Sequence, residues 1–272
     1  MKILVLVIAC IALTLAAVPI MWALVRAWKF ERANFQGKVI PTGFGFMLVP
    51  AAAPVYAAML LFPVRNAVVG SFLVALLGFG TVGLLDDLYG TRETGGFRGH
   101  LSLLRRGRVT TGFVKAVVGG CLGLGLGAVA ARFDPVSSLV NGLVIGLAAN
   151  TLNLLDLRPG RAVSCFWIGV LALAVARLVR LEVWQGLIPI LVPAAWLTVL
   201  DRSSRVMLGD AGSNALGAIL GLALVYEAGL PARIVLVLFM IAVHLYAERY
   251  SISELIEGNR ILRGVDRVLG AR

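Results

Sequence analysis

A series of apolar segments fills most of the chain and constrains its fold more than any other feature. The segments cover residues 3–25, 44–62, 67–85, 111–131, 136–154, 162–181, 187–200, 213–226 and 230–247. Most approach the length of about 20 apolar residues that a helix needs to cross a bilayer. Only 14% of the 272 residues are charged and 60% are hydrophobic, whereas about 25% of residues are charged in typical soluble domains. The sequence therefore predicts an all-α integral membrane protein, a polytopic bundle of about nine transmembrane helices.

The distribution of basic residues predicts the orientation of this bundle. Most of the 25 lysines and arginines follow the first, third, fifth, seventh and ninth segments. The positive-inside rule then places these loops in the cytoplasm, the N-terminus outside and the C-terminus inside. We expect a multi-pass protein of the plasma membrane. The first segment is longer than the apolar core of a signal peptide, which favours a retained helix.

The net charge of +11 does not predict binding to nucleic acid. The basic residues interrupt apolar segments and form no stripe, so anionic lipid headgroups and phosphorylated substrates are the expected partners. We divide the chain into a transmembrane domain, residues 1–248, and a cytoplasmic amphipathic tail, residues 249–272, with a break at Gly258 and Asn259. Glycines at four-residue spacing, as in Gly123/Gly127, Gly142/Gly146 and Gly217/Gly221, predict close helix packing.

Two neighbouring carboxylates end the third apolar segment, in the stretch GLLDDLYG. Asp86 and Asp87 repel one another and resist burial, so they need a cation, a basic partner or water. Such a pair can bind a divalent cation, or one carboxylate can act as a base while the other binds the metal or orients the site. The pair alone does not decide between these roles.

A second polar group ends the fifth segment, in the stretch NTLNLLDLRPGRA. Asn150, Asn153 and Asp156 follow one another at intervals of three residues, which places them near one face of a continuing helix. Polar side chains in a membrane helix are costly unless they are satisfied, so we expect a polar cavity. Arg158 and Arg161 follow and could bind phosphate oxygens. The alternative is an interhelical hydrogen-bond cluster with a basic flank.

A third acidic loop reads VMLGDAGSNALG. Asp210 stands between glycines at the start of an apolar helix, where it could be either a helix cap or a metal ligand.

Taken together, these motifs resemble the polyprenyl-phosphate N-acetylhexosamine-1-phosphate transferase superfamily. That superfamily includes phospho-N-acetylmuramoyl-pentapeptide transferases and undecaprenyl-phosphate N-acetylglucosamine-1-phosphate transferases of peptidoglycan and other cell-wall synthesis. The matching stretches are DD at 86–87, NxxNxxD at 150–156, GDxGSxxLG at 209–217 and, less closely, KVIPTGFG at 38–45.

The resemblance implies a magnesium-dependent reaction at the cytoplasmic face, with Mn²⁺ as an alternative cation. A polyprenyl phosphate attacks the β-phosphate of a UDP-amino sugar and gives a polyprenyl-diphosphate sugar and UMP. The resemblance makes Asp86 and Asp87 the catalytic candidates, and it makes Asp210 and Asp156 the candidate metal ligands. The candidate substrate-binding residues are Lys38, Lys115, Asn150, Asn153, Arg158, Arg161 and Met207. A homodimer is left open.

The chain departs from the family pattern in several places, among them Leu157, which follows Asp156 where the family has glycine. The histidine-rich loop near the last helices is replaced by IAVHLYAERYSISELIEG, and Met207 stands where the muramoyl branch has an aromatic residue that stacks on uracil. Two alternatives therefore stay open: a catalytically silent relative that binds polyprenyl phosphate or organises a cell-envelope complex, and an unrelated transporter with intramembrane acids.

Overall fold

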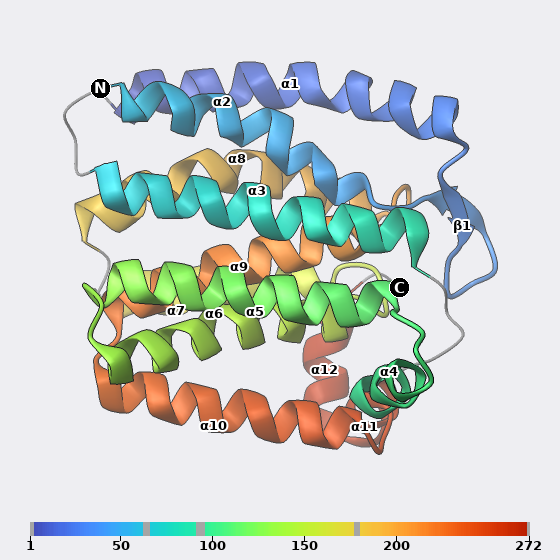
Figure 1. Ribbon diagram of the computed structural model, residues 1–272. Coiled ribbons are helices and arrows are strands. Elements are labelled where there is room, and N and C mark those ends of the chain that lie inside the picture. The colour runs from blue at the N-terminus through green and yellow to red at the C-terminus, as the bar shows by residue number, and fades with distance from the viewer. Residues whose placement is uncertain (1–2, 62–65, 91–95, 177–179, 271–272) are drawn as a thin grey trace.

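The computed structural model describes residues 3–61, 66–90, 96–176 and 180–270, and nearly all of its elements are helices (Figure 1). Their bounds are α1 Ile3–Trp28, β1 Glu31–Ala33, β2 Val39–Pro41, η1 Phe44–Met47, α2 Leu48–Leu60, α3 Asn66–Tyr89, α4 Gly96–Arg105, α5 Thr111–Ala130, α6 Pro135–Leu155, α7 Arg161–Val175, α8 Leu181–Arg202, α9 Gly209–Glu227, α10 Leu230–Ala247, α11 Ile252–Gly258 and α12 Arg260–Leu269. The two strands form one antiparallel hairpin.

Each predicted apolar segment overlaps a helix, although the sixth, 162–181, runs past the end of α7 at Val175 to the first residue of α8, Leu181. Six of these helices, α1, α3, α5, α6, α8 and α10, are long and apolar enough to cross a membrane, and Phe44–Leu60 and α7 are shorter apolar helices. The chain thus has the helices of a multi-pass, all-α membrane protein. Position 62, which ends one predicted segment, and positions 177–179, which lie within another, are outside the described residues.

Helix α9 lies at the centre of the bundle, between α3 and the α5–α6 pair (Figure 1). Almost all of its side chains from Ala211 to Val225 are buried. Small residues permit the close packing: a Cβ added to Gly217 would lie 2.5 Å from the Ala148 carbonyl oxygen of α6. Asp210 lies in the first turn of α9. The burial of this helix therefore places the Asp210 carboxylate among the surrounding helices of the bundle.

The predicted glycine packing is found at Gly217, and between α5 and α6 it is found at three glycines. A Cβ on Gly123 would lie 2.8 Å from the Gly142 carbonyl oxygen, and one on Gly127 would lie 2.5 Å from the Gly142 nitrogen. Gly146 is different, since a Cβ there would meet nothing within 4 Å. A side chain at this position of α6 would therefore enter open space.

The hairpin, α4 and α11 gather at one end of the bundle, where α1 and α3 also end (Figure 1). The tail forms the two short helices α11 and α12, which meet at Asn259, and the Asn259 side chain caps α12. Arg161 at the start of α7 donates to both carboxylate oxygens of Asp266 in α12, at 2.6 and 2.9 Å. The tail is therefore docked on the end of the bundle that carries the acidic loops.

Candidate functional site

The four sequence motifs meet at this end of the bundle. The backbone of residues 41–45 runs beside residues 207–208: Met207 N donates to Pro41 O at 2.7 Å, and Gly45 N donates to Leu208 O at 2.9 Å. The Ser213 hydroxyl donates to Asn153 Oδ1 at 3.0 Å and joins α9 to α6. Motifs that are up to 179 positions apart in the chain thus share one site.

Asp87 anchors the start of α9. Its two carboxylate oxygens accept hydrogen bonds from the backbone nitrogens of Asp210 and Ala211, at 3.0 and 2.9 Å. A carboxylate at a helix N-terminus satisfies amides that have no partner within the helix. Gly209 makes the close approach possible, since its φ is +71° and a Cβ there would lie 2.7 Å from Asp87 Oδ2.

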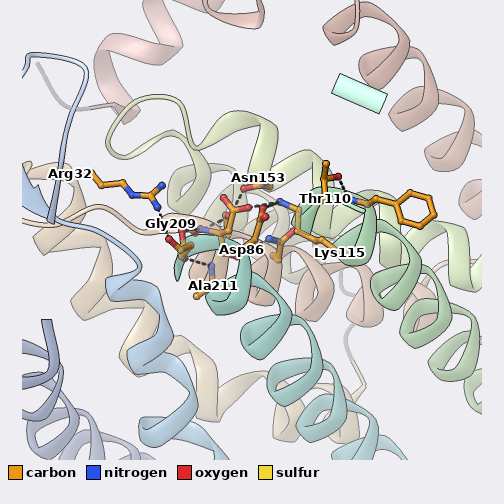
Figure 2. A network of polar contacts seen from close by, with 12 residues as sticks. Arg32, Asp86, Thr110, Lys115, Asn153, Gly209 and Ala211 are labelled. Carbon is orange, nitrogen blue, oxygen red and sulfur yellow. Dashed lines mark hydrogen bonds and ion pairs between the residues drawn. The ribbon is translucent and has the colours of Figure 1, made fainter. Parts of the chain in front are cut away.

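Asp86 faces a different partner. The Lys115 ammonium of α5 lies 2.7 Å from Asp86 Oδ2 and also pairs with Asp210 Oδ2 (Figure 2). All three side chains are largely but not fully buried. One cation from α5 therefore neutralises carboxylates that come from α3 and α9.

Asp156 ends α6 close to the same cluster. Loss of contact with water, followed by the negative charges of Asp201 and Asp210, raises the pKa of Asp156 well above its ordinary value. The hydrogen bond from the Gly209 amide acts in the opposite direction. Asp156 is thus a carboxyl group whose ionised form needs a further positive charge nearby.

A single cavity of about 1510 Å³ contains this cluster and continues into the bundle. At its polar end lie Asp86, Asp210 and Lys115. From there it passes over an apolar trough between α5, α6 and α10, lined by Gly119, Gly120, Leu124, Leu139, Leu143, Gly146 and Ile241. Leu124 and Leu139 in the trough wall are about half exposed, so the trough reaches the apolar outer surface of the bundle.

All but two of the predicted site residues line this cavity, namely Asp86, Asp87, Lys115, Asn150, Asn153, Asp156, Arg158, Met207 and Asp210. Lys38 is exposed on the hairpin and is absent from the lining. Arg161 is also absent: it is 6% exposed and binds Asp266 and the Ser253 hydroxyl of the tail. The structure thus places Arg161 in the tail contact, where we had expected a phosphate-binding residue.

Other residues of the site were not predicted. Arg32 of β1 donates to the Asp87 carbonyl oxygen at 2.8 Å and lines the cavity, so the hairpin supplies a basic residue at the site other than Lys38. Asp201 is 1% exposed and accepts from Gly160 N at 2.7 Å and from Leu208 N at 3.3 Å. It joins the loop that follows Asp156 to the loop that precedes Asp210.

The donor set determines which cation could bind here. Among the described residues, no three His, Cys, Asp or Glu side chains are grouped so that they could hold a metal ion. Asp86 and Asp210 nevertheless direct one oxygen each to a common cation, the Lys115 ammonium. Mg²⁺ commonly takes one or two carboxylates from a protein and completes its coordination with water and substrate phosphates. These residues fit a magnesium ion whose remaining ligands are water or, once a substrate is present, its phosphate oxygens, and they do not fit a closed structural metal site.

No protein-family model matches the chain, and a search of curated proteins finds no match.

Proposed function

We propose that the protein transfers a sugar-1-phosphate from a UDP-amino sugar to a polyprenyl phosphate, with Mg²⁺ as cofactor. The observation that carries this proposal is the shape of the cavity, in which a cluster of carboxylates and basic groups continues into an apolar trough. An amphiphile with a phosphate head and a long hydrocarbon tail matches both parts.

The electrostatics support a reaction between phosphates. The acceptor and donor phosphates are both anionic and repel one another, so the site must supply positive charge. Arg32, Lys115 and Arg158 place basic groups around the cavity, where Lys115 pairs with Asp86 and Asp210 and Arg158 pairs with Glu257 of the tail. When bound, Mg²⁺ would offset the charge on the transferred phosphate and on the departing UMP.

The bond changes of the proposed reaction are simple. An oxygen of the lipid phosphate forms a bond to the β-phosphorus of the donor, and the bond from that phosphorus to the oxygen bridging to the α-phosphate breaks. UMP leaves with the bonding electrons. A phosphate monoester has its second pKa near 6, so its oxygen is largely ionised at neutral pH without help from a protein base.

The geometry supports distinct roles for the carboxylates. Asp86 and Asp210 would hold the cation, because their oxygens already converge on one positive charge. Asp87 would hold the first turn of α9, and with it Asp210, in place. Asn150, Asn153, Asp156 and Met207 line the cavity beside this cluster, where the nucleotide would bind.

The membrane orientation belongs to the same proposal. We place the hairpin, the tail and the acidic loops in the cytoplasm of a plasma-membrane protein, with nine spans and the N-terminus outside. Six helices meet the length and composition of a span among the residues described, and the basic loops supply the direction. A soluble nucleotide-sugar and a membrane lipid would both reach a site at that interface.

Purified protein with undecaprenyl phosphate, Mg²⁺ and a panel of UDP-sugars tests the proposal. We expect release of UMP together with a lipid-linked product, and loss of both with EDTA or in Asp210→Asn. Folded protein that binds the lipid but turns over no donor would contradict the transferase and favour the silent lipid-binding relative. Folded protein that does not bind the lipid would favour the transporter.

A further inference from the structure

Lys115 occupies the place between two carboxylates at which a divalent cation would be expected. Its ammonium lies 2.7 Å from Asp86 Oδ2 and pairs with Asp210 Oδ2, and the three side chains come from three different helices (Figure 2). Their exposed fractions are 19%, 16% and 26%. In such a partly dehydrated place, two carboxylates without a cation between them would repel each other strongly.

A lysine ammonium and a metal ion would have the same electrostatic effect on these carboxylate oxygens. Both offset the repulsion between Asp86 and Asp210. Either cation approaches both carboxylates most closely when it lies between them. If a divalent cation took that position while Lys115 stayed, two positive groups would lie in van der Waals contact. The lysine and the metal ion are therefore competitors for one site.

The surroundings of Lys115 leave room for its side chain to move. The cavity passes over Gly112, Ala116 and Gly119, the small residues that flank Lys115 along α5. A lysine has a flexible four-carbon stem and three hydrogen-bond donors that can rotate. Its ammonium can thus leave the carboxylates and remain inside the cavity.

We propose that Lys115 is the resident counter-ion of the metal-free site, and that it leaves Asp86 and Asp210 when these carboxylates bind a divalent cation. The released ammonium then binds the phosphate groups of the substrates. This inference rests on the proposed function for the identity of the cation. It adds an order of events: the metal ion binds first, and the basic group for phosphate becomes available as a consequence.

Binding of Mn²⁺ to the full-length protein in neutral-lipid nanodiscs, without donor or acceptor, tests the competition. The free Mn²⁺ signal in electron paramagnetic resonance measures the dissociation constant. Lys115→Met removes the competing cation, so we expect it to bind Mn²⁺ at least about tenfold more tightly than the wild type. Unchanged or weaker binding by folded Lys115→Met would overturn the proposal.

Two further variants separate competition from a general effect of charge. Arg106→Met removes the same charge from an exposed position outside the cavity lining, so we expect less than a twofold change in Mn²⁺ affinity. Lys115→Met with Asp210→Asn should lose the tightening, because one of the two carboxylates is gone. An equal gain in Arg106→Met, or a gain that survives Asp210→Asn, would contradict direct displacement at this site.

A measurement on the wild-type chain does not depend on the folding of any variant. An amine-reactive acylating reagent, followed by mass spectrometry, reports how accessible each lysine is. Mg²⁺ should increase the rate of Lys115 labelling several-fold and leave the rate at the exposed Lys38 unchanged. A rate at Lys115 that Mg²⁺ lowers or leaves unchanged would contradict its release.

These tests do not require turnover. If Lys115→Met binds Mn²⁺ more tightly but the protein turns over no donor, Lys115 is the counter-ion and the proposed transferase activity is wrong. Magnesium-dependent turnover without tighter binding in Lys115→Met would uphold the transferase and reject the counter-ion.

Discussion

Asp86 and Asp87 are adjacent in the chain, yet the two carboxylates have different partners. Asp86 pairs with the Lys115 ammonium, whereas Asp87 accepts from two backbone amides at the start of α9. Successive residues of a helix point about 100° apart, so one can face the cavity while the other faces α9. Substitution at the two positions should therefore have different consequences.

The first prediction compares the amide variants of these two residues. Asp87→Asn has one acceptor oxygen for two amides, so we expect a loss of about 1–3 kcal/mol of stability together with lower turnover. Asp86→Asn should lower turnover by about 10²-fold or more with little loss of stability, because no backbone amide depends on it. Thermal unfolding in detergent and the turnover assay measure both effects. Equal melting temperatures for the two variants would contradict an anchoring role for Asp87.

The second prediction concerns pH and Asp156. Its pKa is raised in the folded protein, so folding favours the protonated carboxyl group. This contribution to stability is complete below the ordinary Asp pKa of about 3.9 and is lost as pH rises through the raised value. In EDTA, the melting temperature of the wild type should fall relative to that of Asp156→Asn between acidic and neutral pH. Parallel pH profiles for the two proteins would show that Asp156 is not desolvated.

At the scale of single elements, α5 carries Lys115, the basic residue of the site, and also lines part of the trough. Gly120 and Gly125 both leave open space for a Cβ, but only Gly120 lines the cavity. They form a matched pair for testing whether the trough holds a lipid tail.

The third prediction uses this pair. Gly120→Leu places a branched side chain in the trough, so polyprenyl phosphate should bind at least about tenfold more weakly. Gly125→Leu adds the same side chain to the same helix outside the trough and should bind like the wild type. Native mass spectrometry with polyprenyl phosphate measures both affinities. Equal binding by the two variants would place the lipid elsewhere.

The fourth prediction concerns the contact between α7 and the tail. Arg161→Met breaks the ion pair with Asp266, so trypsin should cleave the tail within residues 260–267 about tenfold faster or more. The same change at the exposed Arg205 should leave cleavage unaltered. If Arg161→Met raises the donor KM and leaves the tail protected, the residue binds phosphate as the sequence alone had suggested.

For the whole molecule, the apolar segments were sufficient to predict the long helices of the bundle, but not α4. Their ends were less predictable, because contacts from distant parts of the chain determine them. The eighth segment was predicted to begin at 213, but α9 begins at Gly209, where Asp87 of α3 accepts from its first amides. A hydrogen bond between residues 123 positions apart leaves no local pattern in the sequence.

The candidate site shows the same limit. Its acids and amides could be chosen from their motifs, and they line one cavity. The basic residues could not be sorted in this way, since Arg32, Lys38, Arg158 and Arg161 all stand near motifs. Only the packing reveals that Arg32 reaches Asp87 while Arg161 holds the tail. Asp201 was visible as an acid at a segment end, but its two backbone partners come from separate loops.

The most direct test of the proposed transfer follows the β-phosphorus of the donor. A UDP-sugar that the panel identifies, labelled with radioactive phosphorus at the β-position, is incubated with undecaprenyl phosphate and Mg²⁺. Transfer of sugar-1-phosphate predicts that the label moves into the lipid fraction while unlabelled UMP is released. Label that stays with the nucleotide, or that appears as water-soluble phosphate, would contradict the account, since the protein would then transfer the sugar alone or hydrolyse the donor.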